Sequence, residues 1–558
     1  DRDKNGWLSW VKFQPTLRNI FGCSFLPHFD YGKGGRGWRD LWQDALTLLL
    51  TEPIKAREII AGSFAGVRLD GSNATIIAKD NSFLADRNRI NRVWMDHGVW
   101  PYLTTRHYLN RTGDFGFLLR NQIYFRDQQI KRSKAVDLNF RQDDFLQRDV
   151  KNRIYEGSIL EHILIQNLVQ FFNVGSHNIV RLENADWNDG LDMASRQGEG
   201  AAFSFMYAHN LENLCVLLRS LRSRVSTVSL LKELTLLLDT LHSRIDYNDY
   251  KAKQRLLNKY FEATGSISGQ KTELKLDDLI SDLEAKYRHM SGWLAKYEWL
   301  REGFFNGYYD DKGRKVEGKH RGKPMRMMLT SQVFAIMSKV ASKAQVISTW
   351  KAIKKHLFDK KLMGFRLNTD LEGSYLELGR AFGFSYGDKE NGAFFSHMNV
   401  MLANALYSRG FVREGREVFD SLFKMAIADQ AGIPPVLPEY FNSQGQGLYL
   451  YLTGSASWYI YTIIEEVLGI KFELGDVFLE PKLLGRDFFG KRIEIEFFLG
   501  NKKIKLVYEL KSQCLDNKLL SIKEAKLAGK KIPFQSGSCR LKPSLFKSNR
   551  NFINLILG

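Results

Sequence analysis

The stretch ILEHILIQNLVQFF, residues 159–172, repeats apolar side chains three and four positions apart. That spacing gathers them on one side of an α-helix, so the stretch predicts a helix packed against other helices. The same spacing recurs in LWQDALTLLL (41–50), LENLCVLLRSL (211–221), LLKELTLLLDTLHSRI (230–245), SQVFAIMSKV (331–340), VMLANALYSRG (400–410) and SWYIYTIIEEVLGI (457–470). Residues 31–470 are therefore predicted to form one mainly α-helical unit.

Long segments rich in Gly, Asp, Asn and aromatic residues separate these helices. They read GKGGRGWRD (32–40), DGSNATIIAKDNSFLADRN (70–88), NADWNDGLD (184–192), GDKENGAFFSH (387–397) and PPVLPEYFNSQGQGLY (434–449). Loops of this length are usually functional or disordered, and these are too aromatic for disorder. Helix pairs joined by such loops predict a helical toroid with its site at one mouth.

The pattern changes beyond residue 470. IEIEFFLG (493–500) and KKIKLVYEL (502–510) alternate with a period of two around Gly500-Asn501, which predicts a β-hairpin. We therefore expect a small C-terminal β domain over 471–558. Residues 1–30 are expected to be a lead-in segment.

The chain of 558 residues carries a formal net charge of +19, so nucleic acid has to be considered as a partner. Residues 491–558 hold roughly 15 Lys and Arg against about 5 Asp and Glu, about half of the excess. This tail contains no nucleic-acid-binding signature. Specific nucleic-acid binding is therefore disfavoured.

The cysteines are widely spaced and form no CxxC pair, which suggests neither a metal site nor a disulfide framework. They are Cys23, Cys215, Cys514 and Cys539. A reducing cytoplasm is the expected compartment, and no apolar run is long enough to predict a membrane span. Because the chain begins DRDKNG without Met, we expect it to be part of a longer polypeptide.

The segment LENADWNDGLDMA (182–194) carries a carboxylate at every third position: Glu183, Asp186, Asp189 and Asp192. On a helix these like charges would repel, and Asn188 and Gly190 are weak helix formers. An EF-hand loop also fails, because glycine falls at position 5 instead of 6 when counted from Asp186. A solvated acidic loop and a carboxylate held beside Trp187 remain as the two interpretations.

Cleavage of a glycosidic bond needs a carboxylic acid that protonates the leaving oxygen. Asp189 can be that acid, with Trp187 as its wall, because burial against an aromatic ring would raise its pKa. A sugar also needs bidentate hydrogen-bonding groups, and Arg39, Asp40 and Glu390 are suitable.

An inverting hydrolase needs a second carboxylate to activate water, whereas phosphate is already nucleophilic and needs an anion site. His397 and the pair Thr453-Gly454, just before a predicted helix, could form such a site. Each residue also has an ordinary structural explanation: a core histidine, a helix cap or an ion pair. Their combination favours a sugar-cleaving site.

Four ordered motifs resemble glycoside hydrolase family 94, the inverting phosphorylases of β-linked sugars. They are GWRDLWQD (37–44), ADWNDGLD (185–192), KENGAFFSH (389–397) and YLTGSASWYIYTIIEEVLGI (451–470). The resemblance runs from about residue 25 to 485. It implies an (α/α)6 barrel followed by a C-terminal β domain, as well as an N-terminal β-sandwich domain that this chain does not include and that can complete the site, sometimes across a homodimer.

The resemblance implies a role for each matching residue. Asp189 aligns with the general acid. Arg39, Asp40 and Trp187 align with the sugar pocket, and Glu390 is assigned to substrate binding as well. His397, Thr453 and Gly454 align with the phosphate site. The family's phosphate-binding glutamine has no clear counterpart, and Gln444 and Gln446 are both candidates.

The predicted function is reversible, inverting phosphorolysis of a β-glucooligosaccharide to α-D-glucose 1-phosphate and a shortened sugar. Inorganic phosphate is the co-substrate, and no cofactor or metal is expected. FDYGKGGRGWRDLWQD, VWMDHGVWP and PEYFNSQGQGLYLYLTGSASW most resemble 1,2-β-oligoglucan phosphorylases and the phosphorylase-like end of cyclic β-1,2-glucan synthases. The alternatives are an inverting β-glucan hydrolase, with Glu390 or Glu439 as its base, and a sugar-binding fragment that is inactive without its N-terminal domain.

Overall fold

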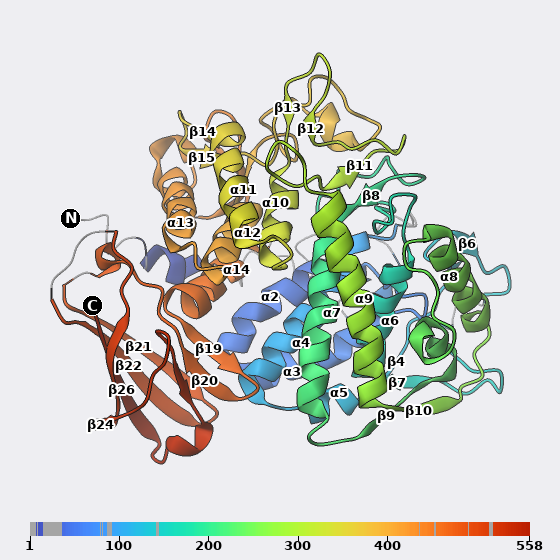
Figure 1. Cartoon of the computed structure of the whole chain (residues 1–558), viewed down its shortest axis with the longest axis horizontal. Helices are drawn as coiled ribbons and strands as arrows, with labels where there is room; N and C mark the ends of the chain where they lie inside the picture. Colours follow the sequence, from blue (N-terminus) through green and yellow to red (C-terminus); the bar gives the residue numbers. More distant parts are fainter. Residues whose placement is uncertain are drawn as a thin grey trace.

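The computed structural model describes most of the chain. The described residues are 7, 9–14, 36–78, 80, 82–85, 92–140, 144–434, 436–450, 454–488, 490–512 and 517–558. Within them the chain is mainly helical up to residue 467 and forms β-strands beyond residue 470 (Figure 1). The predicted lead-in, residues 1–30, lies outside the described residues apart from Trp7 and the helical residues 9–14.

The helices are α2 (Trp38–Thr51), α3 (Pro53–Ser63), α4 (Val99–Thr112), α5 (Gly116–Leu119), α6 (Ile159–Phe172), α7 (Ala201–Leu221), α8 (Tyr250–Thr264), α9 (Leu276–Tyr297), α10 (Leu329–Met337), α11 (Lys343–His356), α12 (Ser396–Ser408), α13 (Val412–Ile427) and α14 (Ser455–Thr462). Six of them contact one another in the order α2, α4, α7, α10, α12 and α14, and α14 contacts α2 again. These helices therefore close a ring, while α3, α6, α9, α11 and α13 pack against its members from outside (Figure 1).

Helix α6 coincides with the stretch whose periodicity predicted it. It begins after Ser158, whose side chain accepts a hydrogen bond from the Glu161 backbone N–H. Every residue of α6 is nevertheless buried, including its polar ones, because α4, α7 and α8 all pack against it. The helix is thus enclosed on all sides instead of being amphipathic at a surface.

The prediction of a helix over 230–245 was wrong. Strand β9 (Thr227–Leu231) pairs with β10 (Lys271–Lys275), and short 3-10 turns, η3 (Lys232–Leu237) and η4 (Asp239–Leu241), follow it. This arrangement buries most of the leucines that suggested a helix: Leu230, Leu231, Leu234, Leu237 and Leu238. The 3-10 turn brings residues three apart to the same side, so it satisfies the same apolar spacing as a helix.

Two sheets form the C-terminal part. One contains β19 (Ile470–Glu473), β20 (Asp476–Leu479) and β25 (Cys539–Leu541), in that order. The other has the order β21 (Arg492–Leu499), β22 (Lys502–Leu510), β26 (Arg550–Leu557), β23 (Ile522–Leu527) and β24 (Lys530–Lys531). Leu499 pairs with Lys502, so Gly500-Asn501 is the two-residue turn of the predicted hairpin, and Gly500 has a φ of 59°.

Short strands connect the helices and shape the loops between them. They are β1 (Arg36–Gly37), β2 (Ile76–Ile77), β3 (Phe83–Leu84), β4 (Asn121–Ile123), β5 (Gln129–Ile130), β6 (Ala135–Val136), β7 (Glu156–Ser158), β8 (Glu199–Gly200), β11 (Tyr308–Tyr309), β12 (Gly318–Lys319), β13 (Met325–Arg326), β14 (Phe358–Asp359), β15 (Gly364–Phe365), β16 (Phe394–Phe395), β17 (Pro438–Phe441) and β18 (Gly447–Leu450). In the sheet β16-β17-β18, β16 leads into α12 and β18 comes before α14. Phe395 of β16 pairs with Tyr440 of β17, which brings Glu439 close to the start of α12.

In the part of the chain that the structure describes, no helix combines the length and the apolar character needed to cross a membrane. Cys215 and Cys539 are buried free thiols.

Candidate functional site

Asp189 lies between two side chains from separate parts of the chain. Its Oδ1 accepts hydrogen bonds from Arg39 Nη2 at 2.9 Å and from Trp94 Nε1 at 2.8 Å. No described residue donates a hydrogen bond to its Oδ2, and the side chain is 31% exposed. Asp189 is thus less enclosed than the sequence suggested, because it lies in an open loop, and the indole bound to it is that of Trp94 instead of Trp187.

Arg39, in the first turn of α2, links the acidic loop to a second carboxylate. Its Nη1 donates to the Asp186 carbonyl at 3.2 Å and lies 3.6 Å from Asp96 Oδ2. Burial alone would lower the pKa of Arg39, but the charges of Asp189 and Asp96 outweigh it and raise the pKa above its ordinary value. Arg39 therefore stays charged and holds Asp189 at a fixed position.

Asp96 is a second carboxylate beside the Arg39 guanidinium. It is fully buried, and its Oδ2 accepts a hydrogen bond from Trp100 Nε1 at 2.8 Å. Burial raises the pKa of Asp96 to about 6. Trp94 and Asp96 lie in the motif VWMDHGVWP, and the sequence alone predicts no role for either residue.

The other three carboxylates of the acidic loop have partners of their own. Glu183 is buried and forms two hydrogen bonds with the Arg132 guanidinium, both at 2.7 Å. Asp186 is also buried and accepts from the Tyr308 hydroxyl at 2.7 Å. Burial raises the pKa of Asp186 to about 7.

Asp192 forms an ion pair with Arg380, and its Oδ1 also accepts from the Arg380 backbone N–H. The same segment approaches Gly190 closely: a Cβ at Gly190 would lie 2.6 Å from Ala381 Cβ. Glycine at this position lets the loop pack directly against the backbone of the Arg380 segment. The loop is thereby fixed while Asp189 remains accessible.

The predicted phosphate residues also come together. Trp187 Nε1 donates to His397 Nδ1 at 3.1 Å, and the two rings meet edge to face. His397 lies in the first turn of α12, and Gly454 is the N-cap residue of α14. A Cβ at Gly454 would lie 3.6 Å from His397 Cε1, so these helix N-termini are adjacent. Thr453 lies outside the described residues.

This anion corner, defined by Trp187, His397 and Gly454, is connected to Asp189 through α2. A Cβ at Gly454 would lie 3.1 Å from Gln43 Cβ, and Gln43 Nε2 donates to the Arg39 carbonyl at 3.4 Å. Trp187 is also only two residues before Asp189 in the acidic loop. The general acid candidate and the anion corner therefore lie in one site.

A group of carboxylates faces Asp189 from other elements. Burial, together with the negative charges of Glu390, Asp40 and Asp189, raises the pKa of Glu439 to about 8. Burial also raises the pKa of Glu390, to which the charge of Asp189 contributes. These electrostatic effects place Asp40, Glu390 and Glu439 around the same site.

Both glutamines that could replace the family's phosphate ligand lie in the turn between β17 and β18. Gln446 Oε1 accepts from Asn442 Nδ2 at 3.0 Å, and the Gln444 backbone N–H donates to Asn442 Oδ1 at 3.0 Å. Both side chains are exposed, and within the described residues neither is hydrogen-bonded to His397 or Gly454.

Comparison with known proteins finds a family match over part of the chain. Residues 271–469 match the catalytic domain of the glycosyl hydrolase 94 superfamily. Relatives along the chain include the cyclic beta-(1,2)-glucan synthase NdvB of Rhizobium meliloti, which is 21% identical over 92% of this chain. The solabiose phosphorylase of Paenibacillus borealis is 23% identical over 82% of this chain.

The chain spans 16% of the length of NdvB and 48% of the length of the solabiose phosphorylase. Among solved structures, a GH78 family rhamnosidase of Bacillus sp. GL1 is similar with a TM-score of 0.45 and 11% identity, over 90% of this chain and 41% of that one. The family match covers residues 271–469, so Arg39 and Asp189 lie outside the matched residues.

Proposed function

We propose that this chain, a member of the glycosyl hydrolase 94 superfamily, catalyses the reversible, inverting phosphorolysis of β-linked glucooligosaccharides. Phosphate attacks C1 of the terminal glucosyl residue while the bond from C1 to the glycosidic oxygen breaks. The bonding electrons pass to that oxygen, which Asp189 protonates. The products are α-D-glucose 1-phosphate and a sugar shortened by one residue.

The observation that carries the proposal is the junction of Asp189 with the anion corner. Arg39 holds Asp189 at 2.9 Å, and the chain of contacts through Gln43 and Gly454 ends at His397. The N-termini of α12 and α14 meet there, and the partial positive charge of helix N-termini favours an anion. The acid and the phosphate would thus reach one sugar from two sides.

The carboxylates near Asp189 favour phosphorolysis over hydrolysis. A hydrolase needs an ionised carboxylate that takes a proton from water at the working pH. With a pKa of about 8, Glu439 is mostly protonated at neutral pH, and burial raises the pKa of Glu390 as well. Phosphate needs no such base, because it arrives as an anion.

The proposal includes the architecture that goes with this chemistry. We interpret the closed ring of α2, α4, α7, α10, α12 and α14, with the outer helices, as an (α/α)6 barrel spanning 31–470. Residues 471–558 would be the C-terminal β domain. A cytoplasmic location is part of the proposal and rests on the wide spacing of the cysteines in the sequence.

A β-1,2 linkage is the proposed specificity. It rests on the similarity of the loop motifs to enzymes of β-1,2-glucans, and the name of NdvB, a cyclic beta-(1,2)-glucan synthase, supports it. Arg39, Asp40, Trp187 and Glu390 would hold the glucosyl residue. The linkage itself would be read by contacts with the next sugar.

The test is sugar release from β-1,2-glucooligosaccharides with and without inorganic phosphate. We expect α-D-glucose 1-phosphate only in the tube with phosphate, and little turnover of cellobiose or diacetylchitobiose. A His397→Asn variant should lose turnover with phosphate, whereas Ser195→Ala, at an exposed position just after the acidic loop, should retain most of it. Equal release of free glucose in both tubes would instead establish the hydrolase.

A further alternative is a sugar-binding fragment that lacks activity. In that case calorimetry would detect binding of β-1,2-glucooligosaccharides, and no turnover would be measured at any phosphate concentration. Supplying an N-terminal β-sandwich domain of the kind that the family resemblance implies should then restore activity, since the site would be complete only with that domain.

A further inference from the structure

A cavity, which we name the far-end cavity, lies at the opposite end of the helix ring from Asp189. Helices α4, α12 and α14 each reach from the proposed catalytic site to this cavity. On α4, Trp100, which donates to Asp96, lies near the N-terminal end, and Asn110 lines the cavity near the other end. On α12, His397 is at one end and Ser408 at the other; on α14, Gly454 and Tyr461 are. The cavity has a volume of about 380 Å³, within the range of small-molecule sites.

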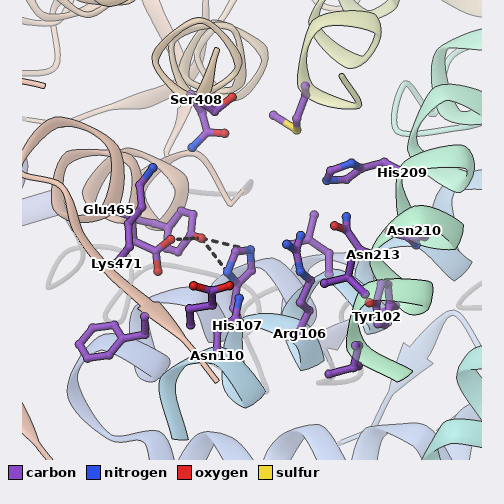
Figure 2. Close-up of a pocket in the computed structure, with 18 of the residues that line it drawn as sticks. Tyr102, Arg106, His107, Asn110, His209, Asn210, Asn213, Ser408, Glu465 and Lys471 are labelled. Carbon is purple, nitrogen blue, oxygen red and sulfur yellow. Dashed lines mark hydrogen bonds between the residues drawn. The ribbon is translucent and has the colours of Figure 1, made fainter. Parts of the chain in front are cut away.

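The cavity contains an arginine without a protein partner. Arg106 of α4 is partly buried, and among the described residues no carboxylate lies within ion-pair distance of its guanidinium. Figure 2 shows Arg106 beside His107, between Asn213 on one side and Glu465 on the other. A partly buried guanidinium normally has a hydrogen-bonded anion as its partner, because burying an unpaired charge is costly.

Neutral hydrogen-bonding groups lie beside this arginine, and the charged side chains of Lys339, Glu465, Glu466 and Lys471 also line the cavity. Burial lowers the pKa of His107 to about 3 and also lowers the pKa of His209, and the charge of Arg106 contributes to both effects. The two imidazoles are therefore uncharged at neutral pH. The Tyr461 hydroxyl lies 2.7 Å from His107 Nδ1 and donates to Glu465, which fixes the wall opposite Asn213 (Figure 2).

Two buried polar side chains of the cavity wall make no hydrogen bond to the described protein. Tyr102 is 1% exposed, and its hydroxyl has no partner. Asn213 is 6% exposed, and its amide forms no hydrogen bond with any described side chain or backbone group. Buried polar groups are almost always paired, so these two groups point to a ligand or to ordered water.

We propose that this cavity, lined by Tyr102, Arg106 and Asn213, binds a small anion that carries hydroxyl groups, with a sugar phosphate as the fitting class. The guanidinium would bind the anionic group, because its planar donors match phosphate oxygens. The amide, the phenol and the neutral imidazoles would bind hydroxyl groups, for which they are suitable donors and acceptors.

The far-end cavity is separate from the proposed catalytic site. Trp458 lines the cavity, and its Nε1 donates to Gln43 Oε1 at 2.9 Å, while Gln43 faces Gly454 on the other side. These buried side chains form the wall between the two sites. The inference therefore goes beyond the proposed phosphorolysis and does not need it to be correct.

Calorimetric titration separates the two sites. All titrations use the His397→Asn variant as the background, because this change weakens binding at the anion corner. The ligands titrated are α-D-glucose 1-phosphate, inorganic phosphate and glucose. We expect the background variant to bind α-D-glucose 1-phosphate and adding Arg106→Gln to weaken this binding at least tenfold. Arg301→Gln is the matched control, because the Arg301 side chain is 83% exposed, and it should leave the affinity unchanged.

Tyr102→Phe gives a second test that does not depend on folding. The hydroxyl has no protein partner, so the variant should unfold at the same temperature or higher, while its affinity for α-D-glucose 1-phosphate falls several-fold. Inorganic phosphate binding as tightly as the sugar phosphate would identify the free anion as the ligand. Unchanged affinity in both Arg106→Gln and Tyr102→Phe, or equal binding of glucose, would overturn the proposal and leave water as the occupant.

The outcome for the proposed function is read independently. Failure of phosphorolysis in the unmodified chain, with Arg106-dependent binding retained, would reject the catalytic proposal and keep the cavity site. Phosphorolysis with no Arg106-dependent binding would do the reverse.

Discussion

Replacing Asp189 by Asn tests the central assignment most directly. Both hydrogen bonds to the carboxylate, from Arg39 at 2.9 Å and from Trp94 at 2.8 Å, are accepted by Oδ1. An amide oxygen at that position can accept both of them. The variant should therefore keep the local structure while losing the proton that the second oxygen would donate.

The expected loss of activity follows from that proton. General acid catalysis typically contributes about 10²–10⁴-fold, which corresponds to about 2.7–5.5 kcal/mol of transition-state free energy. The loss of stability should be much smaller. The ion pair with Arg39 is partly exposed, and such pairs contribute about 0–1 kcal/mol. Arg39 also keeps Asp96 as a neighbour, at 3.6 Å.

The assay compares kcat on the natural oligosaccharide with kcat on β-D-glucosyl fluoride. Fluoride leaves with little protonation, so Asp189→Asn should recover most of its activity on the fluoride. Asp192→Asn is the matched control, because that carboxylate pairs with Arg380, and it should act mainly through stability or affinity. Near-native turnover of the oligosaccharide by Asp189→Asn, with loss in Asp186→Asn, would refute the assignment.

Three further variants examine the surroundings of Asp189. Trp94→Phe removes one hydrogen bond to a charged group, worth about 1.5–3 kcal/mol, so kcat/KM should fall about 10–150-fold while circular dichroism stays unchanged. Gly454→Ala would place a Cβ 3.1 Å from Gln43 Cβ, so the KM for phosphate, measured by initial rates, should rise about tenfold with the KM for sugar unchanged. The pKa of Glu439 is raised to about 8 in the folded protein, so the folded protein keeps a proton on this carboxyl at pH values where the unfolded chain has already released it. The free energy of unfolding is therefore highest at low pH and decreases as the pH rises from the ordinary glutamate pKa towards 8. Glu439→Gln should therefore raise the melting temperature above that of the unmodified chain, by an amount that grows between pH 5 and about 8. An equal rise at both ends of that range would contradict the raised pKa of Glu439.

Periodicity predicted the helices well wherever packing followed it. The helix over 159–172 coincides with α6, and the hairpin turn at Gly500-Asn501 was predicted from the strand alternation alone. The segment 230–245 failed because leucines three apart also fit a 3-10 turn beside a strand. The last ring helix also ends earlier than predicted, since a π-helical turn, Ile463–Val467, replaces its final turns.

The sequence indicated which motifs carry the chemistry but not how they meet. GWRD and NADWNDG are about 145 residues apart, yet Arg39 and Asp189 are in contact. The hydrogen bond from Trp94 could not be predicted, because its motif has no local feature that distinguishes a donor to Asp189 from a core tryptophan. Glu439 was named only as a base candidate, and its raised pKa depends on the burial and the neighbouring carboxylates that folding creates.

The acidic loop shows why a run of like charges can persist in a packed structure. Three of its carboxylates are neutralised by cations: Glu183 by Arg132, Asp189 by Arg39 and Asp192 by Arg380. The fourth, Asp186, is buried without a cation of its own within hydrogen-bond distance, and burial raises its pKa to about 7, so it is half protonated at neutral pH. Repulsion within the run is therefore removed by separate partners on separate elements. Glu183 is buried against Arg132, Asp186 is buried against Tyr308, and Asp192 is held by the Arg380 segment. Asp189 is therefore the carboxylate of this loop whose second oxygen stays available for a proton transfer.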